Sequence, residues 1–235
     1  ETKKQKKDYD TIELKINIDD IINSKKKLVK YYIYDICAFC KGTTAFNDND
    51  IIKCLECNGN NSYCICCGGK GIIFKSNRRC NNCKNGYVKK LTEFNIQIPK
   101  GVPDNHILIV KNKGSYNKDI QNYNHIKLKL IYDLPKNIQI IGNSVFIIVD
   151  ITLFELLCGF KKTIDFGSKT FDINIDNYFN PIDVITYNKM GLPKYKEENT
   201  IGDLVIKFNI IYPDSDDILM QKYNKIFKKM FMKKN

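Results

Sequence analysis

Apolar and polar residues alternate in three segments of the chain, Thr11–Ile16, Phe94–Ile98 and Phe171–Ile175. This alternation is typical of β-strands that have one face in a core and the other in solvent. A fourth segment, Val145–Val149, is apolar throughout, which indicates a strand that is covered on both faces. The pattern therefore predicts a mainly β protein with a few short helices.

The period of the pattern changes near the C-terminus. After Pro213, apolar residues recur at helical spacing, with acidic residues first and lysines later, as the helix dipole favours. We predict an amphipathic C-terminal helix within 213–235, which packs either on its own domain or on a second copy of the chain. Its apolar stripe would comprise Leu219, Tyr223, Ile226 or Phe227, and Met230.

Several short patterns occur twice in the chain. The related pairs are Ile16–Val29 with Asp150–Ile164, Phe94–Ile98 with Phe171–Ile175, Lys111–Gly114 with Asn188–Gly191, and Leu130–Tyr132 with Ile210–Tyr212. The first pair is farther apart than the others by roughly the length of a cysteine-rich segment. We therefore predict two related β-sandwich units in tandem, with that segment inserted in the first. The predicted domains are 9–36 with 87–133, the inserted module 37–86, the second β domain 134–212, and the helix 213–235.

The inserted segment contains four Cys-x-x-Cys pairs, which supply eight soft ligands. The pairs are Cys37 and Cys40, Cys54 and Cys57, Cys64 and Cys67, and Cys80 and Cys83. Two such pairs satisfy one tetrahedral Zn²⁺, so the sequence predicts two zinc ions. The segment has few apolar residues and is rich in Asn, Gly and Lys, so the metal would replace a hydrophobic core. The spacing alone leaves open which pairs share a metal.

Disulfides, an iron–sulfur cluster and a redox-active dithiol are the competing readings of these cysteines. Disulfide-rich domains belong mainly to small secreted chains, and no signal peptide is visible. Ferredoxin-type clusters use different cysteine runs, and a thioredoxin-like site needs a βαβ context. Two cysteines are left over: we expect Cys158 to pack as a small apolar residue, whereas Cys66 is either exposed or competes with Cys64 for metal.

Composition sets the remaining bounds. The 235 residues are 43% hydrophobic, which suffices for one or two cores, and the formal net charge is +12. A nucleic-acid-binding zinc protein is one alternative, but it needs aromatics among its basic residues, and the basic stretch Lys70–Lys90 contains only Phe74 and Tyr87. No apolar run is long enough to span a membrane. Reduced cysteines that hold zinc are expected in the cytoplasm or an organelle matrix. The first residue is Glu, so any targeting signal is expected to lie upstream of it.

Catalytic constellations are not apparent in the sequence. His106 and His125 have no nucleophile signature beside them, and glycine-rich phosphate loops are absent. We expect structural histidines and a protein that is not an enzyme. Thiol-disulfide exchange through a metal-free Cys-x-x-Cys is the remaining catalytic alternative.

One cysteine motif and two flanking motifs carry a family resemblance. Cys64–Gly71 fits the pattern Cys-x-x-Cys-x-Gly-x-Gly in full, and the other three copies keep their cysteines but lose glycines. The two flanking motifs, Ile96–Val102 and the pair Lys189–Pro193 with Gly202–Val205, resemble signatures of the same family. The chain is similar to the client-binding region of type I J-domain co-chaperones, the DnaJ-like heat-shock proteins. The segment between Cys57 and Cys64 is shorter than the family's hairpin, and the J-domain with its His-Pro-Asp tripeptide is not in this sequence.

The resemblance implies a zinc pairing and a function. One zinc would bind Cys37, Cys40, Cys80 and Cys83, and the other Cys54, Cys57, Cys64 and Cys67. The protein would bind unfolded or apolar polypeptides by strand addition and deliver them to a seventy-kilodalton heat-shock chaperone. The edge strand would lie near Leu28–Ile33, with Val29 and Tyr31 at the client pocket and Ile138 as a further candidate. An ordinary core role for Val29 and Tyr31 stays open. The C-terminal helix would form a homodimer.

Overall fold

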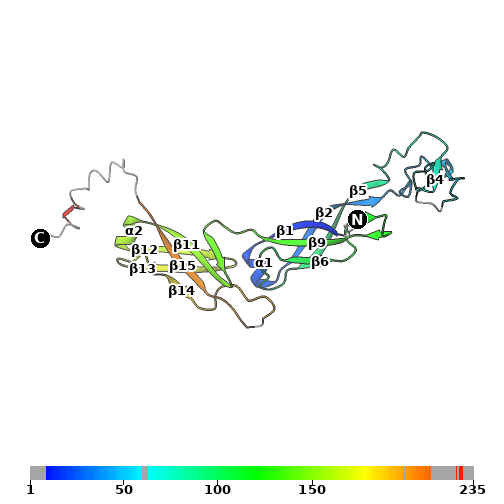
Figure 1. The fold of residues 1–235 in the computed structure, drawn as a ribbon. Helices are drawn as coiled ribbons and strands as arrows, with labels where there is room; N and C mark the ends of the chain where they lie inside the picture. Colours follow the sequence, from blue (N-terminus) through cyan, green and yellow to red (C-terminus); the bar gives the residue numbers. More distant parts are fainter. Residues whose placement is uncertain (1–8, 60–62, 198, 213–225, 227, 230–235) are drawn as a thin grey trace. The chain divides into compact units, whose positions relative to one another are not determined.

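The computed structural model describes residues 9–59, 63–197, 199–212, 226 and 228–229 (Figure 1). The predicted C-terminal helix, 213–235, lies outside the described residues apart from Ile226, Lys228 and Lys229, which are helical. The described part is mainly β, with short α-helices only, as the alternating pattern predicted.

The chain divides into two compact units. Within the described residues, the first unit comprises 9–14, 28–96 and 107–130, and the second comprises 15–27, 97–106 and the chain from 131 onward. Helix α1 (Ile18–Asn23) and the 97–106 segment are thus grouped with the C-terminal half. The predicted domain boundaries, 9–36 with 87–133 and 134–212, stay a prediction.

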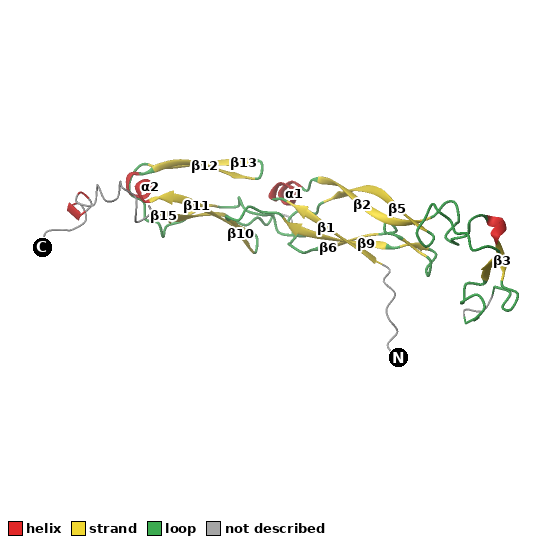
Figure 2. Cartoon of the chain, turned by 90° about the horizontal axis from the view of Figure 1, so that it is seen from above, coloured by secondary structure: helices red, strands yellow, loops and turns green. Residues whose placement is uncertain are grey.

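Two sheets form the N-terminal β structure. One has the order β1 (Tyr9–Ile16), β9 (His125–Tyr132), β6 (Ile107–Val110), and the other pairs β2 (Lys26–Ile36) with β5 (Tyr87–Gln97). Figure 2 shows the two sheets as separate layers. Alternate residues of β2 and β9 are buried between them, because strand side chains point to opposite faces in turn. A small hairpin, β7 (Tyr116–Asn117) with β8 (Asn122–Tyr123), adjoins this structure.

The second unit contains a four-stranded sheet and a hairpin. The sheet order is β10 (Ile138–Ile141), β11 (Ser144–Thr152), β15 (Leu204–Ile211), β14 (Ile185–Tyr187), and the hairpin joins β12 (Phe160–Phe166) to β13 (Lys169–Ile175). The central strands β11 and β15 are parallel, with Val145 opposite Leu204. Only one face of β11 is fully buried, contrary to the apolar run. Phe146 on its other face is partly covered by the Lys207 ammonium, 4.7 Å from the ring centroid.

In the structure, both copies of the predicted repeat contain the same set of polar contacts. In the first copy, Asn17 caps α1 and Asp20 completes a capping box. Lys27, at the start of the next strand, places its Nζ 2.6 Å from Asp20 Oδ2 and 2.9 Å from the carbonyl oxygen of Lys15. Asp20 is buried, so the lysine supplies the charge that its carboxylate needs.

The second copy repeats this arrangement at equivalent positions. Thr152 caps α2 (Leu153–Cys158) and forms a capping box with Glu155. Lys162 on β12 donates to the carbonyl oxygen of Asp150 at 2.6 Å and to Glu155 Oε2 at 3.3 Å. Because the cap, the acid and the lysine recur in the same order and spacing, the two copies of the repeat share one local design: a strand, a capped helical turn and a strand joined by one ammonium group.

Candidate metal centres and client-binding edge

The cysteine module is a set of nested hairpins. Cys37 and Cys40 follow β2, and Cys80 and Cys83 precede β5. Inside them, the short strands β3 (Ile51–Lys53) and β4 (Ile72–Phe74) pair antiparallel, with Ile52 opposite Ile73. The remaining pairs, Cys54 with Cys57 and Cys64 with Cys67, lie between β3 and β4. Each four-cysteine group is therefore held where two antiparallel strands end.

The structure gathers the eight sulfurs into two groups of four. Cys37, Cys40, Cys80 and Cys83 form site I, and Cys54, Cys57, Cys64 and Cys67 form site II, with all ligand atoms of a group within 4.8 Å of one another. In site I, Cys37 Sγ lies 3.9 Å from Cys80 Sγ, and Cys40 Sγ lies 3.6 Å from Cys83 Sγ. In site II, the two corresponding distances are both 3.7 Å. These are the two groups that the family resemblance implies.

The sulfur geometry fits a tetrahedral metal. Four thiolates at about 2.3 Å from a central Zn²⁺ would be about 3.8 Å apart, whereas a disulfide needs about 2.05 Å. All ten cysteines are free thiols. Each group can therefore hold one metal ion, and the all-sulfur donor set favours zinc over hard cations. When bound, the ion would act as a structural brace.

Electrostatics in both groups call for a cation. The backbone N–H of Cys40 lowers the pKa of Cys37 to about 7. Burial, with the thiols of Cys40 and Cys80, raises the pKa of Cys83 to about 12. At Cys64, the backbone N–H of Cys67 lowers the pKa, but burial and neighbouring thiols outweigh it and raise the value to about 11. Four adjacent thiolates repel one another, so full ionisation needs a compensating dication.

Glycines permit the close approach of chain segments behind each site. An added Cβ at Gly86 would lie 2.6 Å from the carbonyl oxygen of Gly42, next to site I. At Gly71, beside site II, it would lie 2.9 Å from both the Cα and the oxygen of Gly59. Gly71 also donates its N–H to Cys67 Sγ at 3.2 Å. Two of the glycines that survive in the cysteine repeats, Gly71 and Gly86, thus let the paired loops meet.

The two remaining cysteines are both exposed. The expectation that Cys158 packs as a small apolar residue is wrong. It lies two positions after Leu156, the buried residue of α2, and this spacing turns it toward solvent. Cys66 lies between the site II ligands Cys64 and Cys67 but is not part of their sulfur group.

The predicted client-site residues lie in two different units. Val29 and Tyr31 face the interior of the first unit, with 4% and 8% of their surface exposed. The Tyr31 hydroxyl donates to the carbonyl oxygen of Lys113 at 2.7 Å, and its ring packs edge-on against Phe94. Ile138 begins β10 in the second unit and is partly buried. Their client-binding role stays a prediction.

One edge of β2 is open over most of its length. Among the described strands, β2 pairs only with β5. The Cys37 N–H donates to Gly86, which precedes β5, whereas the Tyr34 N–H donates to Ser115 Oγ at 3.1 Å. Burial alternates regularly along β2, so the strand has no irregular residue over this length. In a regular strand, the N–H groups of every second residue point to the same edge, so the N–H groups of Lys30 and Tyr32 point to the same edge as that of Tyr34.

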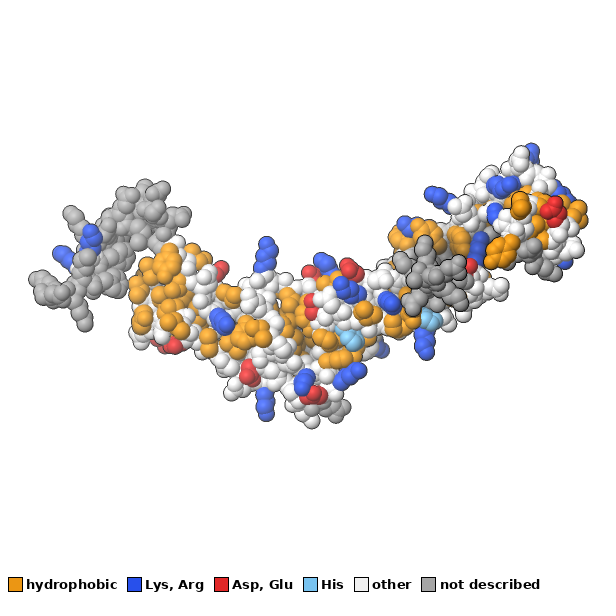
Figure 3. All heavy atoms as spheres, viewed as in Figure 1, with side chains coloured by type: hydrophobic (Ala, Val, Ile, Leu, Met, Phe, Trp, Pro, Cys, Tyr) orange, Lys and Arg blue, Asp and Glu red, His pale blue; other side chains and the backbone are white. Residues whose placement is uncertain are grey.

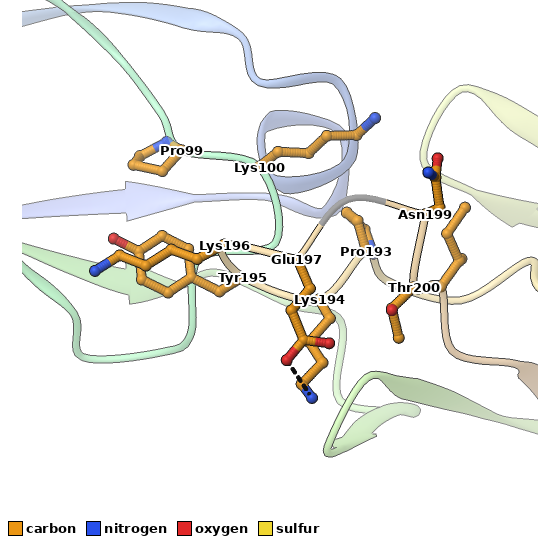
Figure 4. Close-up of a pocket in the computed structure, with 10 residues that line it drawn as sticks. Pro99, Lys100, Pro193, Lys194, Tyr195, Lys196, Glu197, Asn199 and Thr200 are labelled. Atoms are coloured by element: carbon orange, nitrogen blue, oxygen red, sulfur yellow. Dashed lines mark ion pairs between the residues drawn. The ribbon is translucent and has the colours of Figure 1, made fainter.

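The histidines and a hollow in the second unit show no catalytic arrangement. Tyr195 Oη lies 3.2 Å from His106 Nε2, and His125 Nδ1 accepts the N–H of Asn112 at 3.1 Å. A hollow of about 700 Å³ is lined by 99–100, 193–197 and 199–201 (Figure 4). Its acid, Glu197, pairs with Lys194 at 2.6 Å. Cysteine and histidine are missing from the described residues that line it.

Fold and sites together define a mainly β protein with two related units and an inserted module that carries two four-cysteine clusters. Residues 11–213 match the family described as the DnaJ C terminal domain, and the chain belongs to this family. The resemblance seen in the cysteine and flanking motifs is thereby confirmed.

Several curated relatives carry the name chaperone protein DnaJ. The Helicobacter pylori protein is 26% identical over 217 residues, which cover 86% of this chain and 57% of the relative. The Mycoplasma capricolum protein is 25% identical, with 86% and 59% covered. The Thermoplasma volcanium protein is 25% identical, with 93% and 62% covered. The chain thus spans about three fifths of the length of these relatives. Among the described residues, no helix is long and apolar enough to cross a membrane.

Proposed function

We propose that the chain is the client-binding part of a DnaJ-type co-chaperone. It binds unfolded or apolar polypeptide segments and delivers them to a seventy-kilodalton heat-shock chaperone. Binding, rather than catalysis, is its activity. Two Zn²⁺ ions brace the inserted module through the cysteines of sites I and II. Family membership and the chaperone names of the relatives support the general role.

The open edge of β2 is the observation that carries the proposed mode of binding. An extended client adds a strand there, and main-chain hydrogen bonds to Lys30 and Tyr32 supply affinity that does not depend on the amino-acid sequence of the client. Val29 and Tyr31 lie on the interior face of the same strand, where a client side chain entering between the sheets would contact them. Burial of one leucine-sized side chain contributes about 1.5–3 kcal/mol. Such binding is weak enough for capture and release.

A backbone substitution tests this edge directly. Lys30→Pro removes an outward N–H and places a ring at the edge, but it leaves the β2–β5 hydrogen bonds in place. We expect the variant to lose suppression of aggregation of a denatured client, such as chemically unfolded luciferase. Lys30→Ala is the matched control, because it removes the same charge and keeps the N–H. If Lys30→Pro keeps full suppression at an unchanged melting temperature, the client does not bind along β2.

A further inference from the structure

We propose that the first unit also binds single-stranded RNA, on a surface formed by Tyr32, Tyr34, Tyr87 and Tyr116 with Lys84 and Lys89. We call this the tyrosine surface. The proposal concerns the outer face of β2 and β5 and the base of the cysteine module. It does not depend on client binding at the β2 edge.

Two adjoining hollows form most of the surface, and Tyr32 lies beside them in contact with Lys89. The first, of about 1020 Å³, is lined by Tyr34, Tyr87 and Tyr116 together with Lys84, Lys89 and the amides of Asn81, Asn82 and Asn85. The second, of about 1000 Å³, shares Lys84, Asn85 and Tyr116 with the first and extends toward site I. Because the hollows share these side chains, they form one continuous surface. Figure 3 shows basic and apolar side chains interspersed over the module.

Exposed rings stand beside ammonium groups on this surface. Tyr32 and Tyr34 are 62% and 58% exposed, although both lie in the middle of a long strand. Lys89 Nζ lies 4.2 Å from the centroid of the Tyr32 ring, and Lys118 Nζ lies 4.7 Å from that of Tyr87. An unpaired base can stack on an exposed ring while the neighbouring ammonium contacts its phosphate. Duplexes do not offer their bases in this way, so the rings favour a single strand.

The charge of the surface suits a phosphate backbone. Five cationic side chains line the second hollow, namely Lys41, Lys70, Arg79, Lys84 and Lys118, and no acid lines it among the described residues. A dication with four thiolates at site I carries two net negative charges, and Lys41 pairs with Asp48 at 3.2 Å. Asp119, whose charge acts on Tyr87, offsets one further positive charge, and the surface stays positive after all three are counted. Nearby, Asp35 lies 3.4 Å from Lys90 and accepts the Tyr123 hydroxyl at 2.9 Å, so its charge is compensated.

The structure supplies aromatics that the basic stretch of sequence lacks. The aromatic residues of Lys70–Lys90 are Phe74 and Tyr87 alone. Strand β2 brings Tyr34 to the same hollow and Tyr32 beside Lys89, and β7 brings Tyr116. The three asparagine amides of the first hollow can bond base edges and ribose 2′-hydroxyls, which favours RNA over DNA. Basic side chains with interleaved rings on one face are the arrangement that single-strand binding requires.

Fluorescence anisotropy with a labelled oligouridylate RNA and the zinc-loaded chain tests the proposal. Contacts from about three cations predict a slope near −2 for log K against log salt, so affinity should fall about 20-fold between about 50 and 200 mM KCl. Tyr32→Ala with Tyr34→Ala should weaken binding about fivefold or more per ring. Lys84→Gln with Lys89→Gln should weaken binding and make the salt slope shallower by about 1.4.

Matched control variants lie in the second unit. Tyr178 is 65% exposed and Lys161 is an exposed lysine on β12, so Tyr178→Ala with Lys161→Gln changes the same chemistry elsewhere. Melting temperature and zinc content verify that each variant is folded. If the tyrosine double variant does not fold, the lysine double variant provides the test. No binding at low salt, equal loss in the control, or unchanged binding in the lysine pair overturns the proposal. Equal affinity for oligothymidylate overturns the assignment to RNA, and equal competition by polyglutamate overturns the assignment to nucleic acid.

Discussion

Gly71 offers a sharp test of how the module holds its second metal. A methyl group added at Gly71 would lie 2.9 Å from the Cα and the carbonyl oxygen of Gly59, both backbone atoms that cannot rotate away. Ordinary carbon contacts are about 3.5–4.0 Å, and overpacking of this kind costs about 1–3 kcal/mol. The Gly59 loop carries the Cys54–Cys57 half of site II, so relief of the clash moves two ligands. We expect Gly71→Ala to weaken zinc at site II about 5- to 150-fold.

Gly68→Ala is the control for this substitution. Gly68 also has a positive φ, of 58°, but an added Cβ there meets nothing within 4 Å. Both alanines thus bear the left-handed backbone strain of about 1–2 kcal/mol, and only Gly71→Ala adds the clash. Competition with a chromophoric chelator measures the two zinc affinities separately. Equal affinities in the two variants, or loss at site I in place of site II, would refute the reasoning.

Three further predictions follow from the polar repeat and the cysteines. Lys27→Met should destabilise the fold by up to about 3–5 kcal/mol, because it removes the cation that pairs with the buried Asp20 carboxylate. Lys162→Met should destabilise it less, because the Glu155 side chain is 25% exposed. Urea unfolding of both variants compares the two losses of stability. The Thr152 backbone N–H holds the pKa of Glu155 below its usual value, so the stability it confers is present at neutral pH and is lost as pH falls through the lowered pKa. Hydrogen exchange of β12 and β13 in the wild type and Glu155→Gln should differ at pH 7 and converge as the pH falls through this lowered pKa. A chelator should abolish exchange protection of β3 and β4 but not of β11 and β15, and protection that survives demetallation of 37–86 would contradict a metal-based core.

The sequence allowed the class of fold to be predicted because its signals are local. Alternation of apolar and polar residues marks the strands, and the recurrence of Ile16–Val29 as Asp150–Ile164 marks the repeat. The Cys-x-x-Cys pairs likewise predict thiolate sites. Which pairs share a site followed from the family resemblance and not from the spacing.

Other features depend on contacts between distant segments, which local patterns do not record. The tyrosine surface takes one ring from β5, two from β2 and one from β7, so no single stretch of sequence displays it. The solvent-facing position of Cys158 depends on which face of a six-residue helix meets the core. The grouping of α1 with the second unit depends on its contacts with the 97–101 segment, such as the Gly101 N–H donating to Ile21.

The duplicated design gives a physical reason why a metal would brace the first unit. The hairpin β12–β13 closes through two residues, since Phe166 pairs with Lys169 and Gly167 takes a positive φ. The equivalent pair, β2 and β5, is joined by the whole cysteine module. Closure of so much longer a loop costs about 3 kcal/mol more, which a two-residue turn avoids. Site I joins the two ends of this loop through its Cys37–Cys80 and Cys40–Cys83 contacts, so its metal would replace the turn. Site II folds only the insert beyond it, and we therefore infer that the open edge of β2 depends on site I more than on site II.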